Sequence, residues 1–332
     1  MLYEAAYPCL WLMARAKHLH ARTMVVLGRK PTAVLAADAS PETHFRVISW
    51  KIRKFEIERL AALLPGRAAA LALERFEVTR RPKQRRAAME ARARMRLCFS
   101  TYGRRRVDIR SMGPIDGPKV LLLHGWNADG AGLAALSEPL VRGGYQVFIP
   151  DLPGHGTSEG TRYAFQQLGQ AVALCCNPYG PFEAVIGHSA GGLVAGLALQ
   201  NGLKASRLVT LCSPSSLDDL LNTYLLTNQL PVLLLNPMRR RYQRAFGVSP
   251  VDVGPAMFAK LDVPVLAGQD ESDWMIARRN ATDIAEAANG DVFFTRGYSH
   301  LTILRSPELH ERLHTFLASG DVSKGSADVE RY

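Results

Sequence analysis

The feature that most constrains the fold is a regular alternation of short apolar runs and helix-like segments that begins near residue 95. Residues 120–123 form a continuous apolar run closely followed by a glycine, which is typical of a strand buried on both faces of a parallel sheet. Similar runs lie at residues 145–150, 184–187 and 207–212, and segments with apolar residues at helical spacing separate them. The alternation predicts an α/β fold, with a mostly parallel, doubly wound sheet and helices on both of its faces.

Composition narrows the class of protein further. Hydrophobic residues make up 47% of the 332 residues and charged residues 21%, which is typical of a globular chain. No apolar run approaches the roughly 18–20 residues that a membrane-spanning helix needs. Glu4 and Pro8 are unlike the start of a secretory signal, and the five cysteines form no Cys-x-x-Cys or Cys/His cluster. We therefore expect a cytoplasmic protein, in solution or peripheral to a membrane, that holds no metal and no organic cofactor.

The net charge of +11 is unevenly divided along the chain. Residues 1–110 contain 24 Lys and Arg against 9 Asp and Glu, whereas residues 111–332 contain 17 against 21. The first interpretation of this part is an accessory helical layer with a solvated basic face. The alternative is a surface for an anionic membrane or an acidic protein, because basic residues are interleaved with Trp50 and Phe55 at helical spacing. Nucleic acid is not expected, because no nucleic-acid-binding motif is present.

These patterns predict four segments. Residues 1–94 form a basic helical N-terminal extension, and residues 95–318 form the α/β domain. The alternation is interrupted at about residues 213–260 by a segment with helical character of its own. The polar residues 319–332 are predicted to be a flexible tail.

The sequence GHSAGG at 187–192 surrounds Ser189 with small residues. An apolar run precedes it and a segment rich in small, helix-compatible residues follows. A sharp turn from strand to helix that exposes a serine needs small neighbours, because larger side chains would collide within it. Ser189 is therefore a candidate nucleophile.

Four short motifs occur in an order that resembles the α/β-hydrolase superfamily, of the serine esterase and lipase type: HGW at 124–126, DLPGHGTSEG at 151–160, GHSAGG at 187–192 and YSHLTIL at 298–304. The resemblance covers roughly residues 95–320. It implies that the segment at about residues 213–260 is a short helical cap, with leucines, Tyr224 and Met238 among its residues. It implies that Ser189 is the nucleophile and that the backbone N–H groups of Trp126 and Ala190 form an oxyanion hole. It also implies that His124 and Gly125 shape a turn and do not react.

A serine nucleophile needs a base, and His300 is the best candidate among the nine histidines. It follows an apolar run and lies after the serine, as the chain order serine, acid, histidine of this fold requires. His310 and His314 lie four residues apart on a predicted closing helix and fit packing or surface positions better. The side chain of His188 is expected to point away from the site.

The acid that orients this histidine is expected in LAGQDESDWM, just after a predicted strand. Asp270 and Asp273 are equally favoured, and Glu271 is close behind. Asp273 requires a loop two residues longer than the resemblance implies. The sequence alone leaves these three alternatives open.

The resemblance implies a serine hydrolase that cleaves a carboxylic ester or thioester of a small-molecule acyl substrate through an acyl-enzyme on Ser189. An acyltransferase would use the same three residues. A non-catalytic α/β-hydrolase scaffold that binds a ligand or partner is the third possibility. A serine at this position argues against dehalogenase and epoxide hydrolase chemistry, for which the resemblance implies a carboxylate nucleophile.

Overall fold

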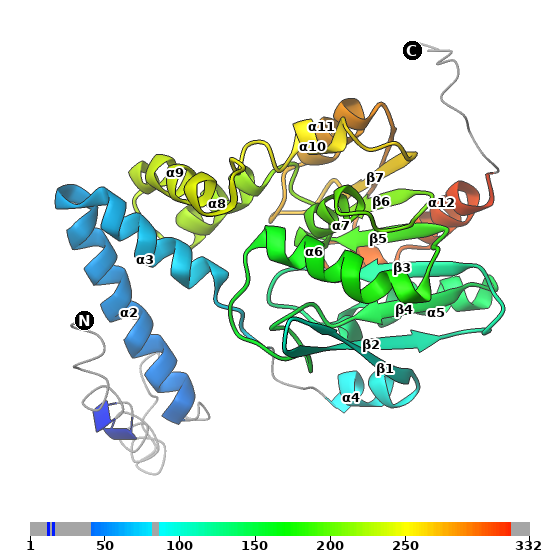
Figure 1. The fold of residues 1–332 in the computed structure, drawn as a ribbon, viewed down its shortest axis with the longest axis horizontal. Coiled ribbons are helices and arrows are strands. Elements are labelled where there is room, and N and C mark those ends of the chain that lie inside the picture. Colours follow the sequence, from blue (N-terminus) through cyan, green and yellow to red (C-terminus); the bar gives the residue numbers. More distant parts are fainter. Residues whose placement is uncertain (1–11, 14, 17–40, 82–85, 320–332) are drawn as a thin grey trace. The chain divides into compact units, whose positions relative to one another are not determined.

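The computed structural model describes residues 12–13, 15–16, 41–81 and 86–319 (Figure 1). The chain divides into two compact units. Unit 1 contains the residues up to Leu73 together with Leu225–Arg241, and unit 2 contains the remainder. The tail predicted at 319–332 lies, apart from its first residue, outside the described residues.

Unit 2 is built on a sheet of eight strands in the described residues, in the order β1-β2-β4-β3-β5-β6-β7-β8 (Figure 1). The strands are β1 (Arg96–Tyr102), β2 (Arg105–Met112), β3 (Lys119–Leu123), β4 (Gln146–Pro150), β5 (Ala184–His188), β6 (Leu208–Leu211), β7 (Val265–Asp270) and β8 (Asp291–Thr295). Strand β2 pairs antiparallel with β1 and with β4, and all the other pairs are parallel. The mostly parallel sheet predicted from the sequence is confirmed.

Helical segments separate the strands along the chain. In chain order they are α2 (Pro41–Leu63), α3 (Pro65–Glu77), α4 (Arg86–Ala93), η1 (Gly130–Leu133), α5 (Ala134–Arg142), α6 (Phe165–Cys176), η2 (Asn177–Tyr179), α7 (Ala190–Gln200), α8 (Leu217–Thr227), η3 (Val232–Leu234), α9 (Leu235–Phe246), α10 (Pro255–Phe258), α11 (Arg279–Ala288), η4 (Thr302–Arg305) and α12 (Pro307–Ala318). Those labelled η are short 3₁₀ helices. In the described residues, no helix combines the length and the apolar character needed to cross a bilayer.

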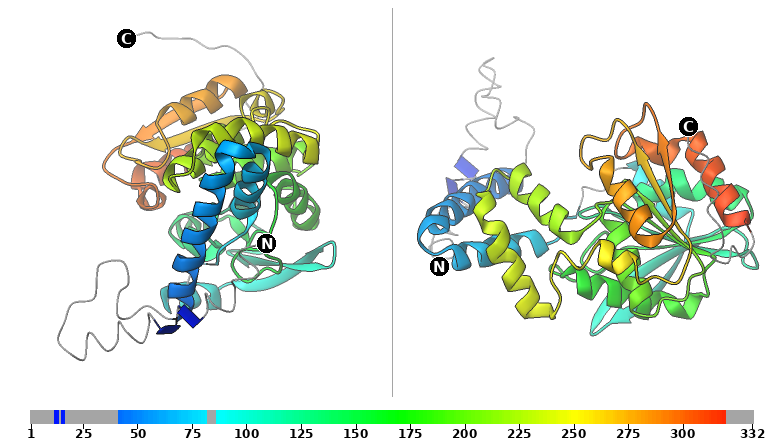
Figure 2. Two further views of the ribbon diagram at one scale, coloured as in Figure 1. Left: turned by 90° about the vertical axis from the view of Figure 1, so that its left-hand side faces the viewer. Right: turned by 90° about the horizontal axis from the view of Figure 1, so that it is seen from above.

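Strand β3 shows why the sheet is covered on both faces. Side chains alternate between the faces of a strand, so neighbouring apolar residues are buried in opposite directions. Val120 and Leu122 join an apolar cluster with Leu136 of α5 and with Leu309 and Leu313 of α12. Helices α6 and α7 pack on each other, and α7 also packs on β5. Figure 2 shows the sheet between its helical layers, which confirms the doubly wound arrangement.

The order of the strands points to one end of β3 and β5 as the place for a site. The chain leaves β3 toward β4 on one side and later returns to β5 on the other side of β3. Leu123 at the end of β3 pairs with Gly187 near the end of β5. Ligands of open α/β sheets bind where the strand order reverses in this way. The turns that follow β3 and β5 are therefore the place to look for a site.

The predicted helical character of the N-terminal extension is confirmed over residues 41–77 by α2 and α3. Part of the predicted cap, residues 225–241, belongs to the same compact unit as α2. Within that unit the Lys54 ammonium donates a hydrogen bond to the Gln229 side-chain carbonyl, at 2.9 Å. These cap residues therefore associate with the N-terminal helix α2.

Unit 2 begins at Glu74, earlier in the chain than the predicted start of the α/β domain at residue 95. Residues 77–81, which we call the strap, are hydrogen-bonded to loops of the sheet. The Thr79 N–H donates to the carbonyl of Thr161 at 2.9 Å, and the Arg80 N–H donates to the Asn127 side chain at 2.6 Å. The end of the predicted extension is thus built into the unit that carries the sheet.

Candidate active site

Ser189 occupies the turn between β5 and α7. Its φ of 56° and ψ of −133° lie in a region that side chains rarely adopt, so the turn stores backbone strain. A Cβ on Gly187 would lie 2.4 Å from the carbonyl carbon of Gly191, and one on Gly191 would lie 2.4 Å from the carbonyl oxygen of Leu123. The small residues around Ser189 are therefore required by the close approach of these backbones, and they leave the serine half-buried.

The turn after β3 passes beside the Ser189 hydroxyl. A Cβ on Gly125 would lie 2.9 Å from the Cβ of Ser189 and 3.3 Å from its Oγ. Ala190 begins α7, and the first N–H groups of a helix have no partner within it. The residues predicted to supply two N–H donors, Trp126 and Ala190, thus directly follow Gly125 and Ser189.

The side chain of Trp126 holds its own backbone in place. Its ring stacks on Phe76 at 5.6 Å and on Phe165 at 5.3 Å, and it meets the ring of His155 edge-on at 5.0 Å. Phe76 also contacts the ring of Tyr224 at 5.2 Å. Phe76 belongs to α3, so a residue of the predicted extension helps to fix this turn, which the sequence did not indicate.

His124 stabilises the same turn by two hydrogen bonds. Its Nδ1–H donates to the carbonyl of Gly125 at 2.8 Å, and its Nε2 accepts the N–H of Leu152 at 3.0 Å. Burial lowers the pKa of His124 and favours the neutral ring that this pair of bonds requires.

His300 is buried and contacts Asp273. The distance from His300 Nδ1 to Asp273 Oδ2 is 2.8 Å. Because an ionised carboxylate can only accept hydrogen bonds, Nδ1 carries the proton and Nε2 is the ring nitrogen left to act as a base.

Three further hydrogen bonds hold the Asp273 carboxylate. Its Oδ2 also accepts the Gln269 side-chain amide at 3.0 Å, and its Oδ1 accepts the N–H groups of Met275 and Ile276 at 2.8 and 3.2 Å. Burial by itself raises the pKa of Asp273, but the hydrogen bond and charge of His300 and these backbone donors outweigh it, so the pKa lies below its usual value. The carboxylate is ionised and fixed in orientation.

The structure does not bring the other two predicted acids to His300. Asp270 accepts hydrogen bonds from the Thr295 hydroxyl at 2.8 Å and the Tyr298 N–H at 3.2 Å, and so ties β7 to the segment after β8. Glu271 forms ion pairs with Arg296 at 2.7 Å and Arg278 at 3.3 Å.

His188 has a role that the sequence did not reveal. Its Nε2–H donates to the backbone carbonyl of His300 at 2.7 Å, across 112 positions of sequence. Because His188 directly precedes Ser189, this bond joins the serine turn to the histidine loop. Burial, followed by the charge of His300, lowers the pKa of His188 to about 4.

This shift predicts a dependence of stability on pH. The unfolded chain binds a proton at His188 near pH 6.5 and the folded chain only near pH 4, so stability falls as the pH falls between those values. We expect His188 to contribute a loss of about 2 kcal/mol in the free energy of unfolding between pH 7 and pH 5. Urea unfolding at both pH values should show that His188→Gln loses about 2 kcal/mol less free energy of unfolding between pH 7 and pH 5 than the wild type does. His314→Gln, an exposed control on α12, should behave like the wild type; equal losses in all three proteins would contradict the prediction.

Asp151 anchors the loop that follows β4. Its carboxylate accepts the N–H groups of Gly130 and Thr157, both at 2.8 Å, and pairs with Arg92 at 3.2 Å and Arg110 at 3.3 Å. A buried carboxylate needs such partners. Arg92, from the basic segment, therefore neutralises a buried acid and is not part of a solvated face.

A cluster of Cys212, Asp273 and His300 has the residue types of a metal site, with one ligand atom of each within 4.8 Å of the others. Burial raises the pKa of the Cys212 thiol, which favours the protonated form over the thiolate that binds metals. Metal binding would also break the contact between Asp273 and His300. The cluster fits a hydrogen-bonded pair better than a metal centre.

Comparison with known proteins agrees with this fold. Residues 120–322 match the model of the alpha/beta hydrolase family. The magnesium-chelatase 30 kDa subunit of Rhodobacter capsulatus is 40% identical over 105 residues, which are 29% of this chain and 37% of that protein. The pimeloyl-[acyl-carrier protein] methyl ester esterase of Aeromonas salmonicida is 35% identical over 102 residues, 29% of this chain and 38% of that protein.

An esterase from Rhodococcus sp. ECU1013 has a similar fold, with a TM-score of 0.51 at 15% identity over 68% of this chain and 99% of that one. The two sequence matches span little more than a third of the relatives' own length. The relatives therefore include esterases, while substrate and partners are not carried over by these matches.

Proposed function

Since this chain belongs to the alpha/beta hydrolase family, we propose that it is a serine hydrolase that cleaves a carboxylic ester or thioester through an acyl-enzyme on Ser189. The observation that carries the proposal is the hydrogen bond from His188 to the carbonyl of His300, at 2.7 Å. This bond joins the residue immediately before Ser189 to His300, and the His300 ring in turn donates a hydrogen bond to the ionised Asp273.

In the proposed reaction His300 Nε2 takes the proton of the Ser189 hydroxyl as the oxygen attacks the acyl carbon. The bond to the alcohol or thiol then breaks, and His300 gives its proton to the leaving group. A water molecule attacks the acyl-enzyme with the same assistance, which releases the acid and restores Ser189. Asp273 stabilises the imidazolium formed in both steps.

The negative charge that develops on the acyl oxygen would be stabilised by the N–H groups of Trp126 and Ala190. The start of α7 adds the positive end of its helix dipole. The aromatic contacts of Trp126 and the hydrogen bonds of His124 fix one donor before the substrate arrives. Preorganised donors of this kind make a large contribution to acyl-transfer catalysis.

Ester turnover by a serine variant tests the proposal. We expect Ser189→Ala to lower kcat/KM for a p-nitrophenyl ester by about 10⁴-fold or more, because the acyl-enzyme cannot form. Ser206→Ala removes an exposed hydroxyl elsewhere in unit 2 and should leave turnover unchanged. No turnover by the wild type on any ester would favour the non-catalytic scaffold, and an undiminished Ser189→Ala would remove the assignment.

The name of the Aeromonas relative makes methyl esters of a pimeloyl group the first substrates to try alongside p-nitrophenyl esters of increasing chain length. Product analysis in the presence of an alcohol would separate hydrolysis from acyl transfer, since an acyltransferase would form a new ester.

A membrane surface or acidic protein as partner of the N-terminal part remains a proposal. Arg81 and Arg92 of that part are engaged within unit 2.

A further inference from the structure

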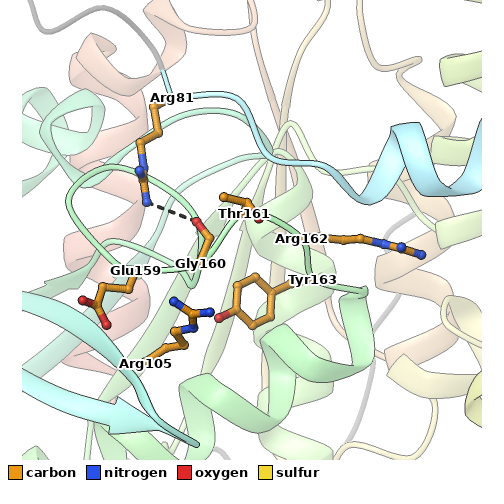
Figure 3. Close-up of a pocket in the computed structure, with 7 residues that line it drawn as sticks. All are labelled: Arg81, Arg105, Glu159, Gly160, Thr161, Arg162 and Tyr163. Atoms are coloured by element: carbon orange, nitrogen blue, oxygen red, sulfur yellow. Dashed lines mark hydrogen bonds between the residues drawn. The ribbon is translucent and has the colours of Figure 1, made fainter. Parts of the chain in front are cut away.

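Unit 2 contains a cavity of about 410 Å³ that the proposed chemistry does not use. Figure 3 shows its lining, which we call the arginine hollow. It consists of Arg81, Arg105, Glu159, Gly160, Thr161, Arg162 and Tyr163. The strap, the start of β2 and the loop before α6 supply these residues, so three segments distant in sequence converge on one hollow.

The hollow has an excess of positive charge that nothing in the described residues neutralises. Arg162 is paired with Glu77 at 2.9 Å. Arg81 and Arg105, in contrast, form no ion pair with any carboxylate of the described chain. Glu159 accepts the N–H of Arg106 at 2.8 Å and supplies the single negative charge of the lining. Unpaired guanidinium groups in a concave site attract anions.

One of the donor groups is already ordered. The Arg81 guanidinium donates to the backbone carbonyls of Ser158 at 2.6 Å and Gly160 at 3.2 Å, which leaves its other N–H groups for a ligand. An ordered side chain loses little further entropy when a ligand binds.

Tyr163 adds a neutral donor to the hollow. Its ring is buried, and Figure 3 shows its hydroxyl beside the Arg105 guanidinium. Burial raises the pKa of Tyr163, although the charge of Arg105 acts in the opposite direction, so the hydroxyl remains protonated. A Cβ on Gly160 would lie 2.5 Å from this hydroxyl, so only glycine allows the arrangement.

We propose that the arginine hollow binds a phosphate ester, with its phosphate held by Arg81, Arg105 and the Tyr163 hydroxyl. Two guanidinium groups and a hydroxyl offer more donors than the two oxygens of a carboxylate can accept, and they match the several oxygens of a phosphate. The volume exceeds that of inorganic phosphate, which leaves room for the alcohol part of an ester. Glu159 can accept a hydrogen bond from a hydroxyl of that alcohol.

Calorimetric titration of the full chain at constant ionic strength tests the proposal. The probes are glycerol 3-phosphate as a monoester, dimethyl phosphate as a diester, inorganic phosphate and succinate. We expect the wild type to bind glycerol 3-phosphate most tightly and succinate least. Arg105→Gln should weaken glycerol 3-phosphate binding at least tenfold, and Tyr163→Phe several-fold.

The control is Arg312→Gln, an exposed arginine on α12, which should bind like the wild type. Equal binding by Arg105→Gln and the wild type, or equal affinity for succinate and phosphate, would overturn the proposal. So would the absence of saturable binding of every phosphate probe. Because the readout is binding, the result is independent of whether Ser189 catalyses ester cleavage.

Discussion

Replacing Asp273 by asparagine is expected to lower kcat for ester hydrolysis by about 10⁴-fold, with little change in KM. An amide can donate a hydrogen bond to His300 Nδ1, so the ring proton would move to Nε2 and the base would be lost. The change also removes the negative charge that stabilises the imidazolium. The measurement is steady-state turnover of a p-nitrophenyl ester.

The two neighbouring acids are the matched controls. Glu271→Gln should leave kcat unchanged, because this carboxylate pairs with Arg296 and Arg278 at the surface and is not the partner of His300. Asp270→Asn should retain kcat within a few-fold but lower the melting temperature, because its carboxylate joins Thr295 to the Tyr298 backbone. A large loss of kcat in either control, with Asp273→Asn near normal, would move the acid role to another residue.

Replacing Gly187 by alanine is expected to destabilise the protein by about 3 kcal/mol, which corresponds to a fall of roughly 10 °C in melting temperature. The added Cβ would lie 2.4 Å from the carbonyl carbon and oxygen of Gly191 and 2.5 Å from the Cα of Gly192. These are backbone atoms, so no rotation of a side chain can relieve the collision. Ester turnover should fall as well, because the serine turn must shift.

Gly132→Ala provides the control for this change. A Cβ on Gly132 would meet nothing within 4 Å, and its backbone is not in the left-handed region. Thermal unfolding should find it within about 0.5 kcal/mol of the wild type. If Gly187→Ala were equally mild, the serine turn would be less tightly packed than the structure indicates.

The alternation of apolar runs was sufficient to predict the sheet and its two helical layers, because strands buried on both faces leave a continuous local signal. The serine turn was also predictable, since its steric requirement selects glycines within a few residues. The choice among Asp270, Glu271 and Asp273 was not. It depends on how the loop after β7 folds back, through donors on Gln269, Met275 and Ile276 that carry no distinctive sequence pattern.

The extent of unit 2 could not be predicted for a related reason. Arg92 looks like one of many basic residues until its partner Asp151, 59 positions away, is known. The same holds for Phe76, whose stacking on Trp126 follows from tertiary packing alone. Local sequence patterns predict helices and strands. Contacts between residues distant in sequence decide which compact unit each helix or strand belongs to.

The central claim is that Ser189 is an activated nucleophile, and covalent labelling with a fluorophosphonate tests it most directly. The account predicts one adduct per chain, located by peptide mass spectrometry at Ser189, with labelling much slower in Asp273→Asn. An unlabelled wild type, or an adduct on any other residue, would contradict it.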